Sequence, residues 1–164
     1  RKFLRLTISE FLGSKSMKSL GIRLLFCATL IYLFSGCGKI TSNINPDISI
    51  NDYQNYYLIP DEDDTRGVGE AIYSDLKSRG FNVEVGPEER ISESTEIKVT
   101  YETKWWWDLT YYLLDLIIYL KDPKTDLLMA SGQSHRPSLD RKPADEMVRE
   151  VMDTILGVST EKDK

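Results

Sequence analysis

The sequence predicts an α+β fold, a two-layer sandwich in which a mixed, mostly antiparallel sheet of about five strands carries two helices on one face. Three observations favour this fold. Apolar residues recur at helical spacing near residues 66–79 and 143–156. Four other segments alternate apolar and polar residues, or are apolar throughout, as strands are. The order begins strand, helix, strand, so we expect the first two strands to be parallel.

The first strand is expected at residues 56–59, followed by Pro60 and four acids at 61–64. Because the glycine-containing spacing of an EF-hand is absent, we interpret the acids as a solvated loop rather than a calcium site. Asp64 or Thr65 then caps a helix that runs to about Arg79 and ends at Gly80. The buried stripe of this helix comprises Val68, Ile72 and Leu76.

Four further strands and a second helix complete the domain. A second strand is expected at 81–85, an exposed polar loop at 86–95, and a third strand from Ile97 to Trp107. The apolar strand at 111–120 leads through a type I turn, Asp122 to Thr125, into a return strand at 126–131. Pro143 begins the last helix and Gly157 ends it. Its buried stripe comprises Met147, Val148, Val151, Met152 and Ile155.

Strict alternation divides the apolar strand into two faces. The face assigned to the core comprises Tyr112, Leu114, Leu116, Ile118 and Leu120. The other face, together with at least one tryptophan, is expected on the side of the sheet without helices. The candidate interaction patch therefore comprises Trp105, Trp106, Trp107, Tyr111, Leu113, Asp115, Ile117 and Tyr119. Alternatively, the 86–95 loop, the N-terminal tether or the C-terminal tail covers it.

The N-terminal region predicts export. Residues 1–16 are interpreted as an over-extended N-terminus, and 17–36 as a signal peptide with a basic start and an apolar run at 24–34. These 11 apolar residues are fewer than the roughly 20 that span a bilayer. Phe34-Ser35-Gly36-Cys37 resembles the bacterial lipobox, which implies cleavage between Gly36 and Cys37 and a lipid on Cys37. The alternative is an ordinary secretory signal with an incidental cysteine.

The mature chain is expected to contain a tether at 37–53, an α/β domain at 54–157 and a charged tail at 158–164. About 15 flexible residues would span roughly 20 to 25 Å, which would hold the domain off the bilayer. By resemblance to lipoproteins, Gly38 after the cysteine favours the outer membrane.

Lys104-Trp105-Trp106-Trp107-Asp108, followed by the apolar strand and the Asp122-Pro123-Lys124-Thr125 turn, resembles a group of small proteobacterial outer-membrane lipoproteins with an uncharacterised α/β domain. The resemblance covers roughly residues 53–157 and implies no catalytic or binding residues. A looser similarity links the architecture to accessory lipoproteins of envelope assembly, such as the lipopolysaccharide-assembly lipoprotein.

Composition excludes several classes of function. From Cys37 onward, 15 basic residues face 25 acidic ones, a net charge of -10, which disfavours nucleic-acid binding. Gly67 and Gly69 lack a following Gly-Lys-Ser/Thr, so we expect no nucleotide. Only one histidine is present, and Cys27 and Cys37 both lie in the N-terminal stretch, so we predict no metal, no cofactor and no internal disulfide in the domain.

Two polar residues could still carry chemistry. His135 would need a nucleophile and an orienting acid, and no spacing enforces either, so a hydrolase is the weaker alternative. The candidate nucleophiles are Ser131, Ser134 and Ser138, and the candidate acids are Asp108, Asp115 and Asp140. Asp115 interrupts an apolar strand and is expected to pair with Lys98, Lys104 or a tyrosine hydroxyl.

The sequence therefore predicts a non-enzymatic lipoprotein, anchored through Cys37 at the periplasmic face of the outer membrane. Its expected partners are the membrane and another envelope protein. The alternative function is binding of a lipid or small apolar ligand in a groove between the sheet and the helices.

Overall fold

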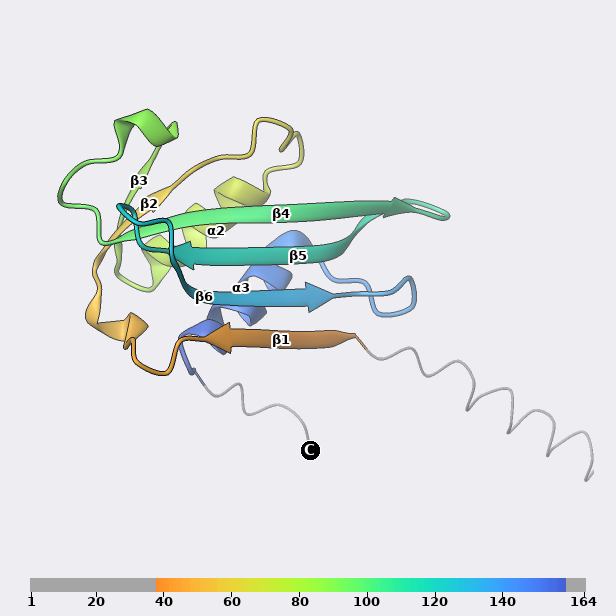
Figure 1. The fold of residues 1–164 in the computed structure, drawn as a ribbon. Helices are drawn as coiled ribbons and strands as arrows, with labels where there is room; N and C mark the ends of the chain where they lie inside the picture. Colours follow the sequence, from red (N-terminus) through yellow and green to blue (C-terminus); the bar gives the residue numbers. More distant parts are fainter. Residues whose placement is uncertain (1–37, 159–164) are drawn as a thin grey trace, which may run out of the picture. The chain divides into compact units, whose positions relative to one another are not determined.

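Six strands form one mixed sheet in the order β1-β6-β5-β4-β2-β3, and two helices cover one of its faces (Figure 1). The computed structural model describes residues 38–158; predictions for 1–37 and 159–164 lie outside the described residues. The strands are β1 (Lys39–Ile44), β2 (Asn55–Leu58), β3 (Asn82–Val85), β4 (Ile97–Trp107), β5 (Tyr111–Lys121) and β6 (Leu128–His135). The helices are α2 (Val68–Ser78) and α3 (Ala144–Ile155), with short 3-10 turns η1 (Ile50–Asp52) and η2 (Glu88–Arg90).

Pairing within the sheet confirms the predicted fold class. β2 is parallel to both β3 and β4, whereas β4, β5, β6 and β1 pair antiparallel in succession. The core lies between the sheet and the helices. Among the described residues, no helix is long and apolar enough to cross a membrane.

The tether prediction for 37–53 was wrong, and the sheet has six strands because of this segment. Lys39–Ile44 pairs along its whole length with β6, from Lys39 opposite His135 to Ile44 opposite Ala130. Ile50 is 4 % exposed and joins the core. The folded domain therefore begins directly after Cys37.

A β-bulge in β5 overturns the predicted assignment of its two faces at residues 111–114, whereas Leu116, Ile118 and Leu120 lie in the core as predicted. Lys104 pairs with Asp115, but the next residue, Trp105, pairs with Leu113, which leaves Leu114 without a partner on β4. Beyond the bulge the alternation of side chains is inverted. Leu113 is consequently in the core at 2 % exposure, whereas Leu114 is half-buried.

The same inversion moves the two tyrosines at the start of β5. Tyr112 is buried but lies outside the core cluster, with the Arg141 guanidinium 4.4 Å from the centre of its ring. Tyr111 does not lie on the open side of the sheet. It shares the helix side with Trp105, beneath Arg66.

The helices pack closely on the sheet. Gly67, rather than the predicted Asp64 or Thr65, is the N-cap residue of α2, but the Asp64 carboxylate accepts hydrogen bonds from the amides of Arg66 and Gly69 at 3.1 and 2.6 Å. Gly132 of β6 lies under α3, where a Cβ would approach Val151 to 2.8 Å.

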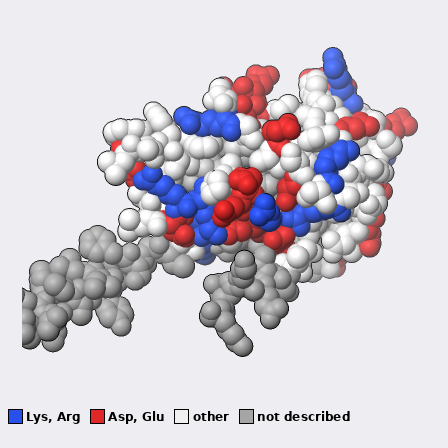
Figure 2. Space-filling view, turned by 180° about the vertical axis from the view of Figure 1, so that it is seen from behind, with Lys and Arg blue, Asp and Glu red and all other residues white. Residues whose placement is uncertain are grey.

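Figure 2 shows the helix face, with basic and acidic side chains side by side across its middle. Arg79 pairs with Asp153 of α3 at 2.8 Å.

Candidate functional site

Within residues 38–158, no segment covers the sheet face opposite the helices over most of β4, β5 and β6. Along each strand every second side chain points to this face, and the side chains between them are buried under the helices. The side chains on this face therefore form three rows across the strands. We call this surface the open face; its rows are Thr100-Tyr119-Ser131, Glu102-Ile117-Gln133 and Lys104-Asp115-His135. β1 extends the rows with Asn43, Thr41 and Lys39. The predicted patch residues Ile117, Tyr119 and Asp115 lie here, whereas Leu113 does not.

Asp115 is paired, as expected, but not with the expected partners. The Nδ1 atom of His135 lies 2.7 Å from Asp115 Oδ1, and Gln133 donates to the same oxygen at 3.3 Å. Lys104 is its register neighbour on β4. These contacts satisfy the carboxylate by cross-strand pairing, which is a structural role.

Tyr119 stands in the middle strand of the open face. Partial burial and the neighbouring carboxylate of Glu102 raise the pKa of its hydroxyl, so the phenol stays protonated. The Lys121 ammonium lies 5.9 Å from the centre of its ring. Tyr119 and Ile117 thus give the open face an aromatic and aliphatic centre with polar groups around it.

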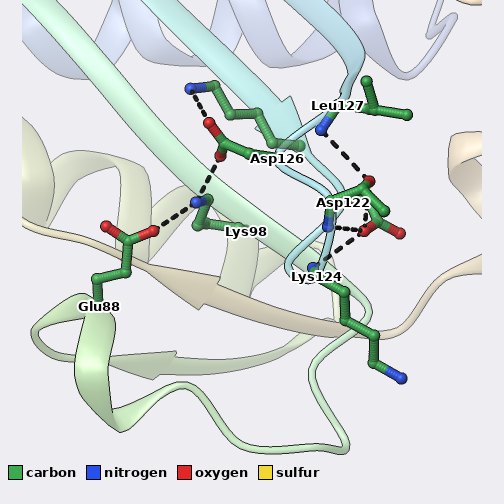
Figure 3. Close-up of polar contacts among 8 residues, drawn as sticks. Glu88, Lys98, Asp122, Lys124, Asp126 and Leu127 are labelled. Carbon is green, nitrogen blue, oxygen red and sulfur yellow. Dashed lines mark hydrogen bonds and ion pairs between the residues drawn. The ribbon is translucent and has the colours of Figure 1, made fainter.

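One end of the sheet face is covered by the loop at 86–95. The Tyr57 hydroxyl donates to the carbonyl of Pro87 at 3.1 Å, and Lys98 is only 5 % exposed beneath Glu88. The Lys98 ammonium lies 2.6 Å from Glu88 and 2.5 Å from Asp126, as Figure 3 shows. Burial opposes the charge on Lys98, but the hydrogen bonds to Asp126 and Glu88 outweigh it and raise the pKa.

The β5–β6 turn positions Asp126 for this contact. Asp122 accepts hydrogen bonds from the amides of Lys124 and Thr125 at 3.0 and 2.7 Å, which folds the turn at the predicted place (Figure 3). Asp126 takes a left-handed backbone with φ of 60°. The 86–95 loop is therefore fastened over this end, whereas the three rows of the open face are free of it.

The opposite end of the sheet carries the hairpin tip, residues 105–111. Trp106 and Trp107 are 53 % and 60 % exposed, and Leu109 in the turn is 90 % exposed. Trp105 is half-buried against the core. The Arg66 guanidinium lies 4.7 Å from the ring of Trp105 and 4.8 Å from that of Tyr111.

The loop after β6 braces the hairpin tip. Arg141 pairs with Asp108, donates to the Thr110 hydroxyl at 2.7 Å and stacks on Tyr112. Hydrogen bonds from Ser138 and Arg141 hold the pKa of Asp108 well below its usual range. Sequence reasoning missed Arg66, Arg141 and Gln133, because nothing local to these residues signals their distant partners.

The predicted patch therefore divides into two surfaces, the open face and the hairpin tip. A catalytic arrangement does not assemble around His135: within residues 38–158 no hydrogen bond joins it to a serine, and Ser134 is fully buried on the opposite side of β6. Ser138 bonds instead to Asp108.

Two surface hollows flank α2, and acidic side chains stand among apolar ones in the lining of both. One, of about 260 Å³, is bordered by Asp61, Asp64 and Glu70. The other lies beside α3 and includes Asp75, Asp145 and Arg149. Neither is the apolar groove that a lipid carrier would need.

Comparison with known proteins identifies the fold but no family. No protein-family model and no curated protein matches the chain. The PelC dodecamer from Paraburkholderia phytofirmans is similar in structure, with a TM-score of 0.57, 12% identity, and coverage of 73% of this chain and 99% of that chain. A PelC variant in another crystal form gives 0.57 and 14% identity over 72% and 97%.

A PDZ domain protein from Parabacteroides distasonis gives a TM-score of 0.47 at 12% identity, over 87% of this chain and 41% of its own length. The chain thus shares its fold with PelC at a low level of sequence identity.

Proposed function

We propose that this chain is a non-enzymatic lipoprotein of the bacterial envelope that binds another envelope protein through its open face. The uncovered sheet face is the observation that carries the proposal. Helices cover the opposite face, whereas Ile117 and Tyr119 remain accessible at the centre of a polar surface. An aromatic and aliphatic centre within a polar rim is typical of protein interfaces.

The charged groups on the open face support a protein partner further. Asp115 is already hydrogen-bonded to His135 and Gln133, and Glu102 lies against Tyr119. A partner could cover these groups with little loss of hydrogen bonding, because each keeps a cross-strand contact.

The membrane anchor belongs to the same proposal. Cys37 follows a lipobox-like segment and directly precedes the folded domain, so a lipid there would hold the domain at the periplasmic side of the outer membrane. The PelC assembly is a dodecamer of that protein, and for this chain we count a second copy among the partners to be tested.

In-cell photocrosslinking tests the proposal. A photoreactive amino acid replaces Tyr119 on β5 or Gln133 on β6, which lie in adjacent rows of the open face. Mass spectrometry identifies the adducts. Ser74, exposed on α2, is the matched control position. We expect one recurrent envelope protein, or a second copy of the chain, at both open-face positions and not at Ser74. Equal adducts at all three positions would refute a specific interface.

The second candidate function, lipid or apolar-ligand binding, has weaker support. Both hollows beside α2 contain carboxylates in their lining, and the interior between sheet and helices is filled by core side chains. Lipid adducts alone at Tyr119 and Gln133 would favour this second function over the first.

A further inference from the structure

The β4–β5 hairpin projects beyond the rest of the sheet with aromatic rings on both of its faces. Lys39, His135, Asp115 and Lys104 form the last row in which β1, β6, β5 and β4 all pair. β4 continues for three residues past this row, which is about 10 Å. Trp106 and Trp107 are neighbours in the strand, so their exposed rings point to opposite faces of the hairpin.

A bilayer is a better binding partner than a folded protein for a projecting hairpin with exposed aromatic rings on both faces. A flat protein surface would cover one face of the hairpin, whereas a fluid layer surrounds both faces and the exposed Leu109 at the turn. Trp and Tyr are the residues enriched at the membrane–water interface. The Arg141 guanidinium over Tyr112 and the Arg66 guanidinium over Trp105 and Tyr111 place cations beside the rings, as anionic headgroups favour.

The chain enters the domain at the same end of the sheet. The start of β1, the loop after β6 and the β4–β5 turn lie together at the right of Figure 1. The Gly38 amide donates to Asp140 at 2.9 Å, and the Cα of Cys37 is only about 3.8 Å from that of Gly38. A lipid on Cys37 would thus begin within one residue of folded structure.

The loop after β6 connects this entry point to the hairpin tip. Asp140 holds Gly38 and pairs with Arg136 at 2.6 Å, and the adjacent Arg141 pairs with Asp108 in the turn. Arg136 also pairs with Glu150 of α3 at 2.6 Å, which fixes the loop to the domain. Leu139 in the loop is 75 % exposed. Entry point and tip are consequently parts of one rigid end.

We propose that the hairpin tip, with Leu139, enters the interfacial layer of the same leaflet that holds the Cys37 lipid. This inference rests on the proposed lipidation of Cys37. It gives the domain two points of attachment, the lipid and the hairpin, so the domain stands in a fixed orientation. The strands then run away from the membrane, and the open face is presented sideways to a partner.

Tryptophan fluorescence reports on the tip alone, because the chain contains 3 tryptophans and all are Trp105, Trp106 and Trp107. The chain from Cys37 onward is coupled through that thiol to a maleimide-headgroup lipid in vesicles of phosphatidylethanolamine and phosphatidylglycerol that also contain brominated phosphatidylcholine. We expect a blue shift and at least about twofold quenching by the brominated acyl chains. Fluorescence that is unquenched by bromine but quenched by aqueous iodide would overturn the proposal.

A change of attachment point provides the matched control. Lys124→Cys with Cys37→Ser couples the domain through the β5–β6 turn, at the other end of the sheet, and should abolish the bromine quenching. Equal quenching from both attachment points would overturn the proposal as nonspecific adsorption. Leu109→Asp should reduce the quenching in the Cys37-coupled protein, while Leu127→Asp, 68 % exposed at the far end, should not.

Because Cys37 is coupled to the lipid chemically, the fluorescence test of the hairpin tip does not depend on whether cells lipidate Cys37. If cells do not lipidate Cys37 but the coupled protein is quenched, the anchor fails and the membrane affinity of the tip stands. If cells lipidate Cys37 but the coupled protein is not quenched, the anchor stands and the tip proposal fails.

Discussion

Leu113→Ala and Leu114→Ala should have very different effects on stability, although the two residues are neighbours in the most apolar strand. Leu113 is 2 % exposed and belongs to the core, so its truncation leaves a cavity and should cost about 2 to 5 kcal/mol. Leu114 is half-buried at the bulge, and its truncation should cost about 1 kcal/mol or less. Strict alternation of side chains predicts the reverse order.

Urea denaturation followed by circular dichroism measures the difference, with Cys37→Ser as the common background. Leu113→Ala should lower the midpoint strongly with an unchanged slope, and should lower the melting temperature by roughly 10 °C for a domain of this size. Equal losses, or a larger loss for Leu114→Ala, would contradict the bulge and with it the separation of the hairpin tip from the open face.

Three further substitutions test other parts of the structure. Gly132→Ala should cost about 1 to 3 kcal/mol by denaturation, because its Cβ would meet Val151 of α3, and Val151→Ala should partly restore the loss. Asp64→Asn should cost about 1 kcal/mol at pH 7. Although burial opposes its charge, hydrogen bonds from the amides of Gly69, Val68 and Arg66 hold the pKa of Asp64 below its usual value in the folded protein. Its contribution is therefore present at neutral pH and lost as the pH falls below about 4, so wild type and variant should converge in acid. Lys98→Met should speed amide hydrogen exchange in the 86–95 loop without affecting α3, and unchanged exchange in the loop would show that Glu88 does not fasten it.

The sequence was sufficient to predict the elements whose patterns are strong. Both helices have a full apolar stripe with a glycine after the end, and β4 alternates over its first half, so these elements lie within one or two residues of the predicted bounds. The turn at 122–125 is determined by local chemistry, the Asp122 carboxylate and the following proline. The fold class and the parallel pairing of β2 with β3 followed from the order of these elements.

The sequence was insufficient where long-range pairing decides the structure. β1 carries only two isoleucines among polar residues and is an exposed edge strand, so its pattern is that of a loop. The bulge at Leu114 leaves no mark in a strand with apolar residues at both 113 and 114. Its consequence is large, because it moves Leu113 from the expected interaction patch into the core and places Tyr111 at the hairpin tip.

Lipid labelling of Cys37 tests the central claim, an anchored envelope lipoprotein, most directly. Cells that express the full chain or its Cys37→Ser variant are fed an alkyne analogue of palmitate, and the purified proteins are analysed by click labelling and N-terminal mass spectrometry. The account predicts label on the wild type alone and a mature N-terminus at a diacylated Cys37. An unlabelled wild type, or equal labelling of Cys37→Ser, would contradict it.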